Sequence, residues 1–179
     1  MDHPTAAHPE NSPDEMVEET DPLGNVLRLV TRREMRANAL WHRSVFIAVV
    51  SNSGQVLVHR RAETKDVWPG CWDVAVGGVM APGEDPAVAA LRELGEELGL
   101  EGVGVRSLGS GVYEDHEVRL VGHCFVCRTD GPFRFADGEI TEAHWAPVEE
   151  LPVWLGAKQF LPDSVALVLP RLGLRGGSA

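Results

Sequence analysis

The segment 78–100 constrains the fold of this chain more than any other part of its 179 residues. Asp85 and Pro86 supply an N-cap and a first-turn residue, and Gly99 supplies a stop, so a helix is expected over residues 86–98. At about 100° per residue, the apolar side chains of this helix gather in one stripe that suits a protein core. The members of that stripe are Ala87, Leu91, Leu94 and Leu98.

A second face of the same predicted helix is acidic. Glu93, Glu96 and Glu97 lie within an arc of about 100°. Carboxylates so close repel one another, each pair by about 1 kcal/mol in water and about 4 kcal/mol at an effective dielectric of 20. A hard divalent cation removes that cost, and ligands that are all oxygen favour Mg²⁺ or Mn²⁺ over zinc. The alternative is a solvated acidic helix face. That alternative does not explain why Gly78, Glu84 and Arg92 occur at their spacing in the segment.

The rest of the chain predicts one α/β domain over residues 15–175, with a mixed β-sheet flanked by helices. Residues 1–14 lack hydrophobic periodicity and are expected to form a disordered tail. Turn residues between 16–20 and 26–30 favour a hairpin, and Thr31 is expected to cap a short helix that ends near residue 39.

Further strands are predicted from apolar runs bounded by turn residues. The runs at 44–50 and 55–61 are expected to pair as a hairpin, and another strand is expected at 72–76. Later strands are expected at 103–113, 118–128 and around residues 144–145. A short helix is expected at 148–151, and Asp163 is expected to cap another that ends near residue 170.

Composition excludes several classes of protein. The 16 Lys and Arg against 27 Asp and Glu give a formal net charge of −11, which argues against a broad nucleic-acid surface. No stretch approaches the roughly 20 apolar residues that a membrane span requires. Three cysteines and the absence of a signal-peptide pattern favour a reduced, cytoplasmic location.

The segment 78–100 reads GVMAPGEDPAVAALRELGEELGL and carries the pattern G-x5-E-x7-R-E-U-x-E-E-x-G-U without a gap, where U is aliphatic. This pattern resembles the signature of the Nudix hydrolase family. The resemblance implies an α/β/α sandwich and hydrolysis of a phosphoanhydride bond in a small diphosphate, such as a nucleoside diphosphate derivative. It also implies Mg²⁺ or Mn²⁺ as the cofactor.

The same resemblance assigns roles to individual residues. The metal ligands that it implies are three carboxylates and one main-chain carbonyl, those of Glu93, Glu96, Glu97 and Gly78. Arg92 and Glu84 are implied to pair and to orient the loop and the helix. Glu97 and Glu96 are both candidates for the general base, and Arg92 completes the implied catalytic set.

A narrower resemblance extends beyond the segment. Residues 40–74 and the stretch YEDHE at 113–117 are similar to the isopentenyl-diphosphate isomerase branch of the family, and more closely to its uncharacterised hydrolase relatives. Arg61 and Lys65 match residues that contact the substrate diphosphate in the isomerases, with solvated strand-end charges as the alternative. Asp115 and Glu117 match two acidic metal ligands, with an exposed acidic turn as the alternative. His42 matches a metal-binding His, with a structural role as the alternative.

Two other functions stay open at this point. An isopentenyl-diphosphate isomerase requires a positioned acid and base. The isomerases have a Cys and two further metal-binding His at positions where this chain has other residues. A non-catalytic nucleotide-binding module often lacks carboxylates of the pattern, and here the pattern is complete.

The sequence also leaves open whether the protein forms a homodimer. Four aromatic residues are candidates to stack on a base or hold an apolar tail, namely Trp68, Trp72, Tyr113 and Phe160.

Overall fold

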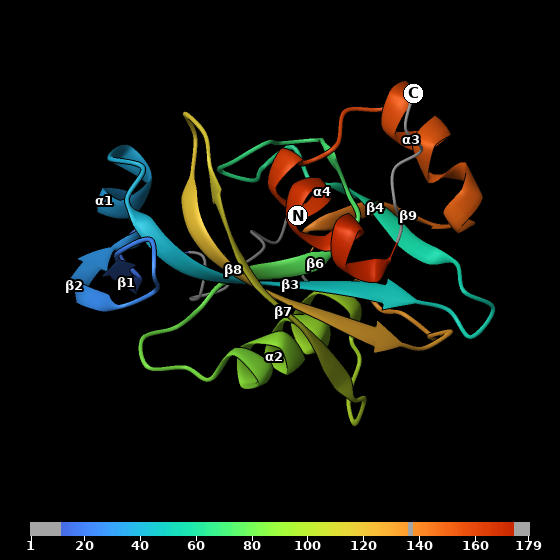
Figure 1. Cartoon of the computed structure of the whole chain (residues 1–179), viewed down its shortest axis with the longest axis horizontal. Coiled ribbons are helices and arrows are strands. Elements are labelled where there is room, and N and C mark those ends of the chain that lie inside the picture. Colours follow the sequence, from blue (N-terminus) through green and yellow to red (C-terminus); the bar gives the residue numbers. More distant parts are fainter. Residues whose placement is uncertain (1–11, 136–137, 174–179) are drawn as a thin grey trace, which may run out of the picture.

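The computed structural model describes residues 12–135 and 138–173, so the expected tail over 1–14 lies mostly outside the described residues. Helices lie on both faces of a mixed β-sheet, with α2 on one face and α3 and α4 on the other (Figure 1). This arrangement confirms the predicted fold class. In the described part, no helix combines the length and the apolar character that a membrane crossing requires.

The N-terminal elements form a small lobe beyond one end of the main sheet (Figure 1). Strands β1 (Met16–Thr20) and β2 (Val26–Thr31) pair antiparallel, as the turn residues between them predicted. Helix α1 (Arg32–Ala37) follows directly, and Thr31 caps it because the Thr31 hydroxyl accepts the backbone N–H of Glu34 at 3.1 Å.

Strand β3 (Trp41–Val50) is the central strand of the main sheet. It pairs in parallel with β8 (Arg119–Arg128) along its whole length, and β8 pairs antiparallel with β7 (Val105–Glu114). Alternate side chains of β3 enter separate hydrophobic cores on the two faces of the sheet. The strand is therefore covered on both faces, which explains its nearly continuous apolar sequence.

The other edge of β3 differs from the prediction. Strand β6 (Val76–Val79) pairs with residues 44–47 in the middle of β3, and β4 (Val56–Arg61) pairs with β3 only at Val50 and Val56. The predicted hairpin of 44–50 with 55–61 is therefore wrong beyond its turn. Strand β4 pairs instead with β9 (Ile140–Ala146) and β5 (Trp72–Asp73).

The strand predicted at 72–76 is divided into β5 and β6. Asp73 causes a local turn, because its Oδ1 accepts the backbone N–H of Ala75 at 3.1 Å. The division lets β5 pair with β4 while β6 pairs with β3. It also places the glycines of β6 beside the helix that follows.

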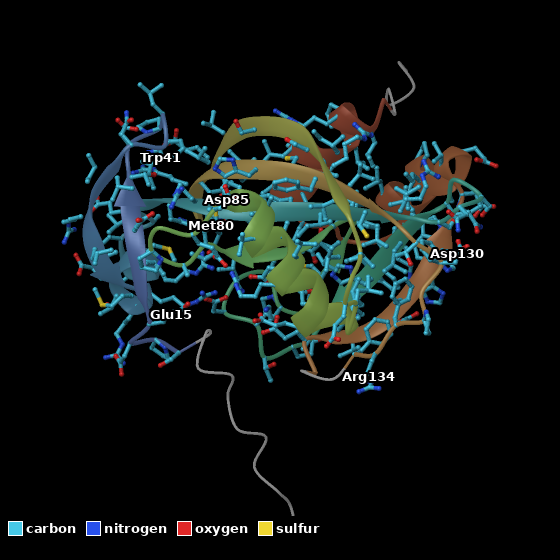
Figure 2. The ribbon with its side chains drawn as sticks, turned by 90° about the horizontal axis from the view of Figure 1, so that it is seen from below. Glu15, Trp41, Met80, Asp85, Asp130 and Arg134 are labelled. Carbon is cyan, nitrogen blue, oxygen red and sulfur yellow. The ribbon has the colours of Figure 1, made fainter. Side chains whose placement is uncertain are left out.

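Helix α2 (Pro86–Leu98) has the predicted bounds. Asp85 Oδ1 accepts the backbone N–H groups of Ala87 and Val88 at 2.8 and 3.3 Å, and Gly99 ends the helix with a φ of 65°. Figure 2 shows α2 lying across one face of the sheet, with Asp85 at its beginning. The cap residues alone therefore located this helix.

The predicted apolar stripe of α2 is wrong at one position, because Leu91 is 41% exposed. Leu94 and Leu98 are fully buried, but Glu93 and Glu97 are buried with them. The helix is rotated so that these two carboxylates face β6 and not solvent. The buried side of α2 therefore contains both acidic and apolar side chains.

The C-terminal part covers the face of the sheet opposite α2 (Figure 1). A 3₁₀ turn (Val148–Glu150) leads into α3 (Leu151–Ala157), and α4 (Pro162–Val168) leads into a second 3₁₀ turn (Leu169–Leu172). The prediction that Asp163 caps the last helix is wrong. Pro162 occupies the first helical position, so Leu161 is the N-cap and Asp163 lies within the first turn.

We expect Asp85→Ala to lower the free energy of unfolding by about 1 kcal/mol, because two first-turn N–H groups lose their acceptor. Urea unfolding followed by circular dichroism measures the change. Glu101→Ala alters an exposed carboxylate just beyond the helix and should change stability by less than about 0.5 kcal/mol. Equal stabilities for the two variants would show that the cap is dispensable.

Candidate active site

A bidentate ion pair ties α2 to the loop that precedes it. Arg92 Nε and Nη2 donate to Glu84 Oε1 and Oε2 at 2.9 and 3.1 Å. Glu84 Oε2 also accepts the backbone N–H of Ala81 at 2.9 Å. Although partial burial opposes the shift, these hydrogen bonds hold the pKa of Glu84 below its usual value. The structure thus brings together the two residues that the sequence proposed as an orienting pair.

The same arginine contacts two carboxylates of its own helix. Arg92 Nη1 donates to Glu93 Oε1 at 2.9 Å and to Glu96 Oε2 at 3.2 Å. One guanidinium therefore joins three carboxylates of the signature segment. This contact holds Glu93 and Glu96 next to each other in spite of their like charge.

Two glycines of β6 let the helix carboxylates approach the sheet. A Cβ atom on Gly78 would lie 2.4 Å from Glu93 Oε1, and a Cβ atom on Gly77 would lie 2.0 Å from the carbonyl oxygen of Val45. The backbone N–H of Gly77 donates to Glu97 Oε1 at 3.2 Å. Side chains at either glycine would therefore displace the helix or the strand.

Glu93 and Glu97 are buried charges of the same sign. Their exposed fractions are 7% and 5%. Burial raises the pKa of Glu93 to about 7, although Arg92 opposes the shift. Burial, followed by the negative charge of Glu93, raises the pKa of Glu97 well above its usual value, with Lys65 opposing. The protein thus holds two carboxylates in positions where ionising both is costly.

These donors fit a hard divalent cation. Among the described residues, no group of three or more His, Cys, Asp or Glu side chains is already arranged to hold a metal ion. The carboxylates of Glu93 and Glu97 are nevertheless adjacent, buried and mutually repelling. A cation of charge +2 would offset that repulsion, and an all-oxygen donor set suits Mg²⁺ or Mn²⁺.

A cleft of about 850 Å³ opens beside the glutamates. Arg61 and Lys65 line it together with Glu93, Glu96 and Glu97. Arg61 Nη2 donates to the carbonyl of Val67 at 3.2 Å, and Arg61 forms no ion pair with the described residues. Lys65 forms an ion pair with Glu139. Both predicted substrate-binding cations therefore face the same cleft as the carboxylates, and Lys65 carries a carboxylate partner there.

Asp115 and Glu117 lie in the turn between β7 and β8. Asp115 Oδ1 accepts the backbone N–H groups of Glu117 and Val118 at 2.7 and 2.9 Å, and Asp115 Oδ2 accepts the Tyr113 hydroxyl at 2.8 Å. Neither acidic residue is among the described residues that line the cleft. Their metal-binding role stays a prediction, and the contacts shown here are those of a turn.

His42 and the four aromatic candidates occupy different places. His42 lines the cleft, donates from Nδ1 to the carbonyl of Leu40 at 3.0 Å, and has a pKa lowered to about 3 by burial and then by Arg36. It is therefore a neutral imidazole at pH 7. Of the aromatic candidates, only Trp68 lines the cleft among the described residues. The other three pack elsewhere, Tyr113 against Asp115 and Trp72 against Phe160.

Sequence reasoning missed five acidic residues that line the cleft, namely Glu15, Asp66, Asp73, Glu139 and Asp163. Asp73 was assigned to a strand interior and Asp163 to a helix cap. Glu139 is 74 residues away from its partner Lys65, so no local pattern could have joined them. Only the pairing of β4 with β5 and β9 brings these distant segments to one cleft.

We expect Glu97→Gln to stabilise the metal-free protein at pH 8. The folded-state pKa of Glu97 is raised, so wild-type stability is full below the unfolded-state pKa of about 4.5 and falls as pH rises through the raised value. Thermal unfolding in a chelator from pH 5 to 8 measures this loss, which should be smaller in Glu97→Gln. Glu101→Gln, which alters an exposed carboxylate, should follow the wild type. A Glu97→Gln profile that coincides with the wild-type profile would contradict the account.

Comparison with known proteins identifies the family of this chain. The NUDIX domain family model matches residues 40–164. The uncharacterised Nudix hydrolase YfcD of Escherichia coli (strain K12) is 37% identical over 151 residues, which cover 84% of this chain and 83% of that protein. The uncharacterised Nudix hydrolase orf19 of Rhodococcus erythropolis is 35% identical over 174 residues, which cover 88% of this chain and 92% of that protein.

Solved structures show the same fold. DR0079 from Deinococcus radiodurans superposes with a TM-score of 0.71 at 25% identity, covering 83% of this chain and 94% of that chain. The MutT protein from Methanosarcina mazei Go1 superposes with a TM-score of 0.60 at 24% identity, covering 74% of this chain and 91% of that chain. With the domain match over residues 40–164 and relatives at 35–37% identity across most of their length, this chain belongs to the Nudix family.

Proposed function

We propose that this protein is a metal-dependent hydrolase that cleaves a phosphoanhydride bond in a small diphosphate. The observation that carries the proposal is the buried pair Glu93 and Glu97, which the chain holds at the edge of a cleft that also presents Arg61. Two buried like charges are unfavourable unless a cation or a reaction uses them. Relatives that carry the name Nudix hydrolase support the same reaction class.

Four groups of the chain would hold the metal, namely the carboxylates of Glu93, Glu96 and Glu97 and the carbonyl of Gly78. When bound, Mg²⁺ or Mn²⁺ neutralises charge on phosphoryl oxygens and lowers the pKa of a bound water. Arg92 positions Glu93 and Glu96 through its hydrogen bonds, and Glu84 positions Arg92. These contacts keep the carboxylates oriented before any ligand arrives, which lowers the cost of reorganisation.

A proton acceptor is needed to activate the attacking water. Glu97 and Glu96 were the candidates from the sequence, and both line the cleft. Glu97 also has a fixed position, because Gly77 donates a hydrogen bond to it.

The cleft provides cations for the rest of an anionic ligand. Arg61 and Lys65 lie on its wall, and Arg61 has no carboxylate partner in the described part of the chain. A guanidinium binds two phosphate oxygens at once, so Arg61 is suited to a diphosphate. A protein with net charge −11 can therefore bind a small polyanion through this local arrangement.

The buried cysteines favour hydrolysis over isomerisation. Moving a double bond requires an acid and a base placed on opposite sides of the substrate carbon chain. Cys71, Cys124 and Cys127 are all buried, and none of them lines the cleft. Burial also raises the pKa of each thiol, so each stays protonated and unreactive at pH 7.

Glu97→Gln should abolish metal-dependent release of phosphate or phosphomonoester from diphosphates while the fold is retained. The reason is that one variant removes both a metal ligand and the proton acceptor. Mass spectrometry of products formed in oxygen-18 water measures the reaction and identifies the phosphorus attacked. Glu101→Gln is the matched control and should keep wild-type turnover. Full turnover by Glu97→Gln with Mg²⁺ would refute the role of Glu97.

Arg61→Ala should raise KM for a diphosphate substrate about 10- to 100-fold, because a charge-assisted hydrogen bond to phosphate is lost. Initial rates at saturating Mg²⁺ measure KM and kcat separately. Arg106→Ala removes an exposed arginine of β7 and should leave both constants unchanged. If KM for Arg61→Ala equalled the wild-type value, Arg61 would be a structural residue.

A further inference from the structure

The wall of the cleft carries a second pair of carboxylates, which the hydrolytic role does not use. Asp73 belongs to β5 and Asp163 to α4, and both line the cleft that contains Glu93 and Glu97. Their exposed fractions are only 4% and 5%. Burial, and then the negative charge of Asp73, raises the pKa of Asp163 to about 7. The two carboxyl groups are therefore close to each other and share one low-dielectric environment.

Hydrogen bonds from the chain use only part of the accepting capacity of this pair. Asp73 Oδ1 accepts the backbone N–H of Ala75 at 3.1 Å, and Asp163 Oδ1 accepts the backbone N–H of Ser164 at 2.7 Å. Among the described residues, no side chain donates a hydrogen bond to Asp163, although its side chain is 95% buried. Neither aspartate forms an ion pair within the described part of the chain. The Ser164 side chain also hydrogen-bonds to Asp73, and each carboxyl group still has lone pairs that a ligand in the cleft can use.

Arg61 is close to this pair and also to Glu97 of α2. Its positive charge opposes the rise in pKa of Glu97, of Asp73 and of Asp163. Arg61 Nε is buried and has no hydrogen-bond partner. A diphosphate held by Arg61 would therefore lie near both the helix carboxylates and the aspartate pair.

The surface around the aspartates is apolar. Phe46, Val118, Leu120 and Leu161 line the cleft on the α4 side of the sheet. An apolar lining with a few convergent polar groups is typical of a site for a small organic group. This end of the cleft is thus built differently from the charged end near α2.

We propose that Asp73 and Asp163 form a specificity subsite for hydroxyl groups on the organic part of the substrate, such as a sugar or polyol linked to the diphosphate. The proposal rests on the proposed function and names the substrate class of the same cleft. A carboxylate accepts from a hydroxyl, and a protonated carboxyl group also donates to one, so the pair can bind neighbouring hydroxyls in both senses.

The test uses diphosphates in matched pairs, with and without hydroxyl groups, at saturating Mg²⁺. The pairs are ADP with 2′,3′-dideoxy-ADP, and glycerol diphosphate with propyl diphosphate. Asp163→Leu should lower kcat/KM for the hydroxylated member of at least one pair about 10- to 100-fold, mainly through KM, and change its partner less than about twofold. Asp163→Asn keeps a donor and an acceptor and should recover most of the loss. Glu101→Leu is the control at an exposed carboxylate outside this cleft.

The outcomes separate the subsite from the hydrolytic function. Wild-type protein that cleaves no member of either pair with Mg²⁺ or Mn²⁺ would contradict the proposed function and the subsite with it. Cleavage by the wild type with equal losses for both members of each pair would contradict the subsite alone. Loss of one bound Mg²⁺ per chain in Asp163→Leu, measured by calorimetry, would overturn it in favour of a cation site. The unfolding midpoint of each variant is measured in the same buffer. It identifies any loss of activity or of Mg²⁺ binding that arises from unfolding.

Discussion

The burial of Glu93 and Glu97 against β6 is the constraint on which the rest of the structure depends. Two carboxylates on one turn of a helix can enter the protein only if the facing strand has no side chains at that point. Gly77 and Gly78 satisfy this requirement, because a Cβ atom on Gly78 would overlap Glu93. The position of α2 on the sheet, and with it the edge of the cleft, follows from this contact.

Arg92 makes the arrangement possible without a ligand. Its guanidinium contacts Glu84, Glu93 and Glu96, so it offsets part of the negative charge and fixes the loop before α2. Glu97 accepts a hydrogen bond from the backbone N–H of Gly77 and keeps the more unfavourable environment. The cap residues and Arg92 thus fix the helix and its loop, and Glu97 keeps a carboxylate in the environment that the proposed cation would offset.

Much of the fold could be predicted from local sequence. The caps Thr31, Asp85 and Gly99 have strong conformational preferences of their own, and the helices that they bound lie where they were expected. The partner of β4 could not be predicted, because β6 and β9 compete for strands far away in sequence. The same reason hid the ion pair of Lys65 with Glu139. The sequence also separated the acidic and apolar faces of α2, whereas packing on β6 buries members of both.

The part of the candidate site that lies on α2 and in the loop before it could be predicted from the sequence. Glu84, Arg92, Glu93 and Glu96 are joined by contacts within 13 consecutive residues, so spacing alone was sufficient. The aspartate pair depends on the tertiary fold, since β5 and α4 meet only after the sheet has formed. The proposed hydroxyl subsite thus consists of residues that no linear motif contains.

The central claim is that a divalent cation offsets the repulsion between the buried carboxylates of Glu93 and Glu97. Calorimetric titration of the metal-free protein with Mg²⁺ at pH 7, in two buffers of different ionisation enthalpy, tests it most directly. The account predicts saturable binding accompanied by proton release, because the raised pKa values of Glu93 and Glu97 must fall when a cation binds. Absence of saturable binding, or binding with no proton release, would contradict it.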